Sequence, residues 1–252
     1  MIENDVHRWA VWIQFIVAVI TFVGLIFVIA PYGRYERTGW GPRLPKKYGW
    51  MLMEFPAVAL FLVFFFFGDN RLELIPLVFL GIWQLHYLNR AFIFPLRMRF
   101  SSRTIPVLIL ALGISFNILN AYVNARWISH FGAYGSEWLY DPRFLFGVAI
   151  VFAGWFGNLQ SDNILRELRQ PGDADYKIPR GGLFRWVSAP NYSCEIFMWI
   201  GWALATWSTA GLAFAAYTAA NLVPRAFSHH AWYRRMFDDY PSDRKAVIPY
   251  IF

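Results

Sequence analysis

The stretch GNLQSDNILRELRQPGDADYKIPRGGLFRWVSAPNYSCE, residues 157–195, joins two strongly apolar segments yet carries many polar side chains. Four of these side chains are spaced at i, i+4, i+8 and i+11: Asn158, Asp162, Arg166 and Arg169. If the helix that begins near Phe144 continues through them, all four lie on one of its faces. Polar groups at membrane depth are costly unless they face a cavity or a partner. We therefore interpret this stretch as one wall of a polar site in a membrane protein.

The composition of the whole chain is typical of a protein that crosses a membrane several times. Of the 252 residues, 58% are hydrophobic, 20% are aromatic and only 15% are charged, which differs from a soluble domain. The net charge of +7 would suit a nucleic-acid binder. The basic residues lie in short loops between apolar runs, however, where they determine membrane topology. We therefore expect a lipid membrane as partner, and no nucleic acid.

Seven apolar segments predict an all-α integral membrane fold. A bilayer requires about 20 residues of helix, and five segments of that kind cover residues 9–30, 50–67, 74–94, 105–122 and 144–165. The apolar run 192–227 is too long for one span, and a break within it is indicated by Thr206, Ser208, Thr209 and Gly211. Lys and Arg concentrate in the first, third and fifth loops and after residue 224. The positive-inside rule then predicts seven transmembrane helices with the N-terminus outside and the C-terminus in the cytoplasm.

Two polar groups occur inside the predicted second and third spans. Glu54 lies two residues before Pro56, and burial would favour its neutral form, so that it acts as a hydrogen-bond donor. It is equally well explained as an interfacial carboxylate paired with a nearby lysine. Tyr87 and Arg90 are three residues apart and share a helix face. A tyrosine hydroxyl is a natural donor to a substrate carbonyl, although an interfacial tyrosine beside a snorkelling arginine would give the same pattern.

Polar stripes also occur at the cytoplasmic ends of the last two predicted helices. Asn191 and Glu195 are four residues apart, and the same spacing recurs in Arg225, His229 and Tyr233. The simplest joint explanation is one pocket for a large polar ligand, with cations for its phosphates and amides or carboxylates for its other groups. No metal site is expected, because no second His or Cys cluster accompanies the paired histidines of the last helix. The sequence contains no GxGxxG, GxxxxGK[ST] or GxSxG motif.

At these residues the chain resembles the membrane steroid 5α-reductase family. The resemblance covers nearly the whole chain and is strongest from residue 157 onward. It is carried by HYLNRAFIFPLR (86–97), SDNILRELRQPGDADYKIPRGGLF (161–184), NYSCEIFMWIGWALATWS (191–208) and RAFSHHAWYRRMFDDYPSDRKAVIPYIF (225–252). It implies an NADPH-dependent reduction of the 4,5 double bond of a 3-oxo-Δ4-steroid that enters from the bilayer.

The resemblance also implies roles for individual residues. The positions that match the carbonyl-binding Glu and Tyr of the family are Glu54 and Tyr87. The positions that match its nucleotide-binding residues are Asn158, Asp162, Arg169, Tyr176, Asn191, Glu195, Arg225, His229 and Tyr233, with Arg166, Arg90, Arg99 and Trp199 as weaker matches. The chain departs from the family at Met53, where Gln is common.

The resulting expectation is one membrane domain, residues 1–252, that acts as a monomer. Spans one to four, residues 1–125, would form the steroid side, and residues 143–252 would bind NADPH. Hydride would reach C5 while Glu54 and Tyr87 stabilise the negative charge on the 3-oxygen. The basic residues favour NADPH over NADH, because a 2′-phosphate is commonly bound by Arg.

Other functions remain compatible with the residues. Related membrane reductases act on enoyl-CoA thioesters or polyprenols, and the same polar wall would serve them. A membrane methyltransferase that uses S-adenosylmethionine, or a sterol carrier without catalysis, would be built on similar helices. The residues also leave open whether the membrane is a bacterial inner membrane or the endoplasmic reticulum.

Overall fold

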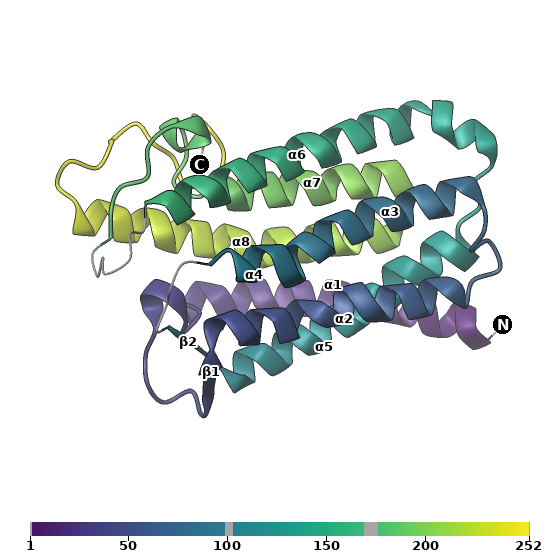
Figure 1. Ribbon diagram of the computed structural model, residues 1–252, viewed down its shortest axis with the longest axis horizontal. Coiled ribbons are helices and arrows are strands. Elements are labelled where there is room, and N and C mark those ends of the chain that lie inside the picture. Colours follow the sequence, from purple (N-terminus) through teal and green to yellow (C-terminus); the bar gives the residue numbers. More distant parts are fainter. Residues whose placement is uncertain (1, 99–102, 169–175, 252) are drawn as a thin grey trace.

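The computed structural model describes residues 2–98, 103–168 and 176–251, and nearly all of its regular structure is helical. The helices are α1 (Ile2–Phe27), α2 (Lys46–Phe66), α3 (Leu74–Leu88), α4 (Phe94–Leu96), α5 (Val107–Arg126), α6 (Pro142–Glu167), α7 (Pro190–Thr206) and α8 (Thr209–Met236). Short helical turns are η1 (Gly33–Tyr35), η2 (Asn89–Ile93), η3 (Trp127–Phe131), η4 (Ser136–Tyr140) and η5 (Gly182–Arg185). The long helices run along one common axis (Figure 1). The strands β1 (Arg43–Pro45) and β2 (Thr104–Pro106) pair in antiparallel register at one end of the bundle (Figure 1).

Within the described residues, four helices are long and apolar enough to cross a membrane: Ile2–Phe27, Lys46–Phe66, Val107–Phe131 and Pro142–Glu167. Helix α3 has 15 residues and α7 has 17, so both are shorter than an ordinary span. Helix α8 has 28 residues but becomes polar in its second half. An all-helical membrane protein is thus supported, whereas seven spans and the orientation of the termini stay predictions.

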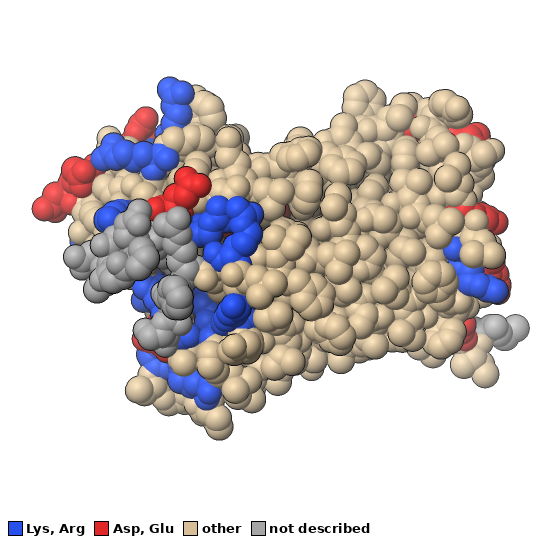
Figure 2. Space-filling view, viewed as in Figure 1, with Lys and Arg blue, Asp and Glu red and all other residues tan. Residues whose placement is uncertain are grey.

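The surface of the bundle has the polarity that a membrane protein needs. On the face shown in Figure 2, the middle of the bundle is almost entirely uncharged, and charged side chains gather at the two ends. Helix α1 contributes strongly to this belt, because Trp9, Val19 and Ile20 are each more than 60% exposed. Apolar side chains exposed to this extent along one helix indicate contact with lipid.

Helices α6 and α7 pack unusually closely, because glycines line their contact. A Cβ atom on Gly201 of α7 would lie 2.7 Å from the carbonyl oxygen of Gly147 in α6. One on Gly154 would lie 2.6 Å from the carbonyl oxygen of Cys194. Small residues permit such close approach of membrane helices. This packing brings the polar stripe of α6 next to that of α7.

The predicted break between the last two apolar segments is confirmed. Helix α7 ends at Thr206, and Trp207 adopts a left-handed conformation with φ of 45°. Ser208 then caps α8, since its side chain accepts a hydrogen bond of 2.9 Å from the backbone N–H of Gly211. A serine at this position satisfies one of the unpaired N–H groups of the first turn. The chain thereby reverses, and α7 packs against α8.

The fourth apolar segment extends further than predicted. The sequence suggested an end at residue 122, but α5 continues to Arg126 and then through η3. The buried Arg126 is paired with another helix, because its Nε donates to Glu3 of α1 at 2.7 Å. Pairing across helices therefore keeps a charged residue in the helix where hydropathy alone predicts its end.

Candidate active site

A cavity of about 940 Å³ lies between α1, α2, α5, α6, α7 and α8. That volume lies near the upper limit for small-molecule sites, so it is large enough for an extended ligand or for two ligands together. The residues predicted for the site that line this cavity are Glu54, Asp162, Arg166, Asn191, Glu195, Arg225, His229 and Tyr233. Residues from three stretches far apart in the sequence therefore meet in one space.

Four further predicted residues do not line the cavity or cannot be placed. Asn158 is buried behind the wall, where its amide donates to the carbonyl oxygen of Asn191 at 2.8 Å and to Glu195 at 3.3 Å. Tyr87 is buried in the aromatic core. Tyr176 packs against Trp232 outside the cavity, with ring centroids 4.8 Å apart. Arg169 lies outside the described residues, as does the weaker match Arg99.

Arg90 connects the walls of the cavity through charge. Its guanidinium lies 3.4 Å from Asp162 of α6 and 3.9 Å from Glu195 of α7. Asn191 donates to the other oxygen of Asp162 at 3.2 Å. The planar face of Arg90 also stacks near Trp50, 5.1 Å from the ring centroid. Buried charges need such partners because an unpaired charge in a dry interior is very costly.

The position of Arg90 depends on an irregular helix turn. The third apolar segment was predicted as one regular span, but α3 passes into the π-helical turn η2 before α4 continues the same path. A π turn inserts one residue and redirects the side chains that follow, and such turns are frequent at functional sites. Arg90 lies within this turn and faces the cavity.

Helix α8 presents its predicted stripe to the same cavity. Arg225 donates to the hydroxyl of Tyr192 at 3.0 Å, and that hydroxyl also lies 3.2 Å from Nε2 of His229. One turn further, the hydroxyl of Tyr233 accepts a hydrogen bond of 3.2 Å from Arg34. The i, i+4 and i+8 positions thus face one wall, as the spacing predicted.

The first loop supplies a site residue that the sequence gave no reason to select. Arg34 looked like one of several topological charges, yet it lines the cavity with its guanidinium 4.5 Å from the ring centroids of Trp232 and Tyr233. One of its nitrogens, Nη1, is buried and has no hydrogen-bond partner among the residues that the structure describes. A buried guanidinium N–H without a partner suits an anionic ligand group.

Tyr35 holds this loop against α8. Its hydroxyl donates to the carbonyl oxygen of Ser228 at 2.7 Å, and its ring stacks on His229 with centroids 5.5 Å apart. Burial raises the pKa of Tyr35 to about 12, so the hydroxyl stays protonated and continues to donate at physiological pH. The loop is therefore fixed as part of the wall at the polar end of the cavity.

Glu54 lies where the polar and apolar walls meet. Its carboxyl interacts with Arg90 and Glu195, and Oε2 accepts a hydrogen bond of 3.4 Å from Asn117 of α5. The same amide donates to the carbonyl oxygen of Met53 at 2.7 Å. Asn117 therefore fixes the part of α2 that carries Glu54.

The wall beyond Glu54 is apolar. It is built by side chains of α1 and α5, among them Val17, Ile20, Leu25, Leu112 and Phe116. Phe116 stacks face to face on Tyr217 of α8, with ring centroids 3.4 Å apart. This part of the cavity would fit a flat apolar molecule whose one polar atom points toward Glu54.

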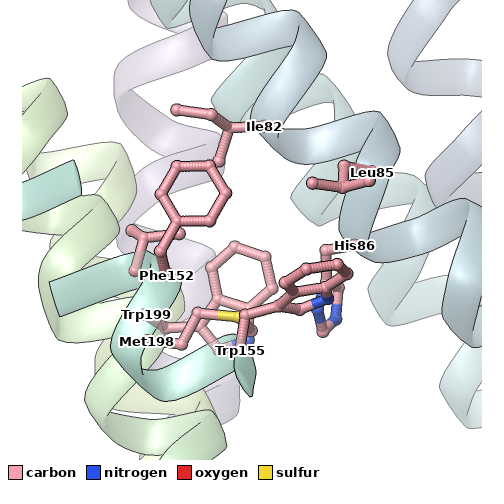
Figure 3. A pocket seen from close by; sticks show the side chains of 8 residues that line it. Ile82, Leu85, His86, Phe152, Trp155, Met198 and Trp199 are labelled. Atoms are coloured by element: carbon pink, nitrogen blue, oxygen red, sulfur yellow. The ribbon is translucent and has the colours of Figure 1, made fainter. Parts of the chain in front are cut away.

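Tyr87 lies behind this junction, within interaction range of Glu54. Its ring packs on Trp83 at 4.7 Å and near Trp199 at 5.9 Å. A second hollow borders the same aromatic group, between α3, α6 and α7 (Figure 3), and His86, Trp155 and Trp199 are among its lining residues. Its volume of about 10 Å³ is enough for one water molecule, so the large cavity is the candidate site for ligands.

The donor set suits a nucleotide cofactor. Seven Lys or Arg side chains line the cavity (Arg34, Lys46, Arg90, Arg97, Arg103, Arg166, Arg225), against the carboxylates Glu54, Asp162 and Glu195. Besides Arg34, His229 also carries a buried nitrogen without a partner within residues 2–98, 103–168 and 176–251. Cations of this kind bind phosphates, and amides or carboxylates bind ribose hydroxyls and bases.

Comparison with known proteins shows which family the chain belongs to. The family model described as 3-oxo-5-alpha-steroid 4-dehydrogenase matches residues 103–252. The chain is 45% identical over 257 residues to "Steroid 5-alpha-reductase DET2" of Gossypium hirsutum, which covers 99% of both chains. It is 41% identical over 243 residues to "3-oxo-5-alpha-steroid 4-dehydrogenase 1" of Rattus norvegicus, covering 96% of this chain and 93% of the relative. With the human protein of that name it shares 42% identity over 223 residues, 88% of this chain and 86% of the relative.

A match of this extent to the family model, together with identities above 40% over nearly the whole chain, decides the assignment. The chain belongs to the steroid 5α-reductase family of oxidoreductases.

Proposed function

We propose that the protein reduces the 4,5 double bond of a 3-oxo-Δ4-steroid with NADPH to give a 5α-steroid. One observation carries this proposal: a single cavity joins the basic and amide-rich wall of α6, α7 and α8 to an apolar wall of α1 and α5. Glu54 lies between the two walls. Relatives at 40–45% identity are named steroid 5-alpha-reductase or 3-oxo-5-alpha-steroid 4-dehydrogenase, which supports the substrate class.

The polar half of the cavity would hold NADPH. In this proposal Arg34, Arg225 and Arg166 bind phosphates, while Asp162, Asn191 and Glu195 bind the ribose hydroxyls and base. Arg169 and Tyr176 are included on sequence resemblance alone. When bound, NADPH supplies the hydride, and the protein supplies orientation and the exclusion of water.

The carbonyl end of the steroid would be held at Glu54. Hydride addition at C5 places negative charge on the 3-oxygen, and a neutral carboxyl donates a hydrogen bond to that oxygen. Tyr87, which interacts with Glu54, would supply the second donor. The carbon C4 then takes a proton, so that one hydride and one proton are added across the double bond.

The membrane arrangement follows from the same geometry. We infer seven membrane-embedded segments, with α3, α7 and α8 added to the four long apolar helices. The two chain ends lie at opposite ends of the bundle (Figure 1), as an odd number of spans requires. The larger cluster of Lys and Arg lies at the end opposite the N-terminus (Figure 2), which supports a cytoplasmic C-terminus by the positive-inside rule. We expect a monomer with NADPH entering from the cytoplasm and the steroid from the bilayer.

Turnover by the purified protein tests the function. The protein in detergent is given NADPH and progesterone or testosterone, and the proposal expects a product heavier by two hydrogen atoms with 5α stereochemistry. No product, with NADPH still raising thermal stability, would redirect the search to enoyl-CoA and polyprenol substrates. Stabilisation by S-adenosylmethionine instead of NADPH would replace the proposal with a methyltransferase.

A further inference from the structure

Helix α5 carries a stripe of asparagines in the middle of an apolar segment. Asn117, Asn120 and Asn124 are spaced at i, i+3 and i+7 and therefore share one face. All three are buried, and Asn120 and Asn124 are at most 1% exposed. Amides at this depth are costly unless they are satisfied or functional. The hydrogen bond from Asn117 toward Glu54 already accounts for the first of them.

A chain of hydrogen bonds fixes the orientation of the other two. The indole Nε1 of Trp202 donates to Oδ1 of Asn124 at 2.9 Å. An indole nitrogen can only donate, so the amide nitrogen of Asn124 must face the other way. That nitrogen donates to Oδ1 of Asn120 at 2.9 Å. Trp202 thus determines which atom donates and which accepts in each hydrogen bond of this series.

The side-chain oxygen of Asn120 accepts as many hydrogen bonds as it can, whereas the side-chain nitrogen still has N–H groups to donate. Oδ1 also accepts a hydrogen bond of 2.9 Å from Gln14 of α1, which occupies both of its lone pairs. Nδ2 is buried and has no hydrogen-bond partner in the described ranges of the chain. The Asn120 side chain lies close enough to the Tyr87 hydroxyl to interact with it. Asn120 is therefore held as a donor beside the Tyr87 hydroxyl.

We propose that Asn120 is a positioning residue for Tyr87, whose hydroxyl oxygen accepts the Asn120 amide N–H when a steroid is bound. This inference rests on the proposed function, because it gives Tyr87 a partner other than the substrate. A tyrosine whose oxygen accepts from Asn120 directs its own O–H away from α5 and toward the 3-oxygen. Hydrogen bonds that are long without substrate commonly tighten in the reacting complex. The chain from Trp202 to Tyr87 polarises each successive donor in the same direction.

A double-mutant cycle tests this inference. Asn120→Leu keeps the side-chain size but removes the donor, and we expect kcat to fall about fivefold, the effect of losing one neutral hydrogen bond. The KM for NADPH should not change. In a Tyr87→Phe background the same substitution should have no further effect on kcat, because the oxygen that Asn120 orients is absent. An equal loss in both backgrounds would overturn the positioning role and leave a purely structural one.

Two further measurements test the inference independently of the Asn120→Leu cycle. Trp202→Phe removes the indole N–H that orients Asn124, together with part of the buried ring. It should show the same non-additivity with Tyr87→Phe, so it replaces Asn120→Leu if that variant does not fold. The carbonyl stretching frequency of a bound isotope-labelled steroid should shift back toward its value in apolar solvent in Asn120→Leu. An unchanged frequency would contradict the inference. If Tyr87→Phe alone leaves kcat unchanged, Tyr87 is not a donor to the steroid, and the positioning role of Asn120 is overturned with it.

Discussion

The two halves of the cavity satisfy their side chains in opposite ways. In the polar half, Arg90, Asp162 and Glu195 are bound to one another or to amides across three helices. In the apolar half, helix α1 contributes Ile20, which lines the cavity and is 64% exposed. The side chains of the polar half are thus held in place by specific ion pairs and hydrogen bonds between helices. The apolar half is lined by aliphatic and aromatic side chains of α1 and α5, which suits the apolar ligand proposed above.

The largest effect is expected at the junction of the two halves. Glu54→Gln replaces an acidic donor with an amide that cannot share its proton with a developing enolate oxygen. We expect kcat to fall about 100-fold or more, as for the loss of an oxyanion-hole donor. Steady-state turnover at saturating NADPH measures it. Glu73→Gln, which changes an exposed carboxyl at the start of α3, is the matched control and should retain full activity. Turnover retained by Glu54→Gln would remove Glu54 from the mechanism.

A change in the polar half should affect NADPH and not the steroid. Arg225→Ala removes a cation that lines the cavity, and the loss of a charge-assisted bond should raise the KM for NADPH about tenfold or more. The KM for the steroid should stay within twofold, roughly the scatter of one weak contact. Arg234→Ala on the exposed face of the same helix provides the control. An unchanged requirement for NADPH in Arg225→Ala would contradict the phosphate-binding role of this wall.

A change in the apolar half should affect the steroid and not NADPH, and its effect should be smaller than that of Arg225→Ala. Leu112→Ala truncates a side chain that lines the cavity and is 60% exposed, so we expect the steroid to lose contact worth about one CH₂ group. At about 0.8 kcal/mol, this loss should raise the KM for the steroid about fourfold. NADPH kinetics should not change. Ile118→Ala, on the same helix but outside the cavity, should alter neither constant. Equal effects of the two substitutions on the steroid would mean that this wall is not the steroid site.

The smallest effect is expected outside both halves. Asp141 caps α6 by accepting from the backbone N–H of Arg143 at 2.8 Å, and its hydrogen bond to the Arg143 side chain lowers the pKa of Asp141 to about 2. A carboxyl with a lowered pKa stabilises the fold at pH values above its unfolded pKa, and that contribution is lost as the pH falls through about 4 toward about 2. Asp141→Asn should lower the melting temperature slightly at neutral pH and leave both KM values unchanged. The difference should shrink between pH 4 and pH 3, and a constant difference would show that the charge is not involved.

Local chemistry made part of this architecture predictable from sequence. The break near Ser208 follows from helix capping. The stripes on α6, α7 and α8 follow from helical spacing, and seven of their described residues line one cavity. Other features depend on packing between distant segments. Arg34 reaches the cavity only because Tyr35 fixes its loop on α8, and the burial of Tyr87 in the aromatic core follows from the rings that α7 places beside it. The direction of the Asn120 amide depends on Trp202, 82 positions later in the sequence, which spacing within one helix does not reveal.

The central claim is that one cavity holds the nucleotide and the steroid together, so that hydride passes directly between them. NADPH deuterated at both positions of the nicotinamide C4 tests it, with progesterone as substrate in ordinary water. The account predicts a product with one deuterium at C5 on the α face and none at C4, where the hydrogen comes from solvent. A reduced product without deuterium, or with deuterium at C4, would contradict it.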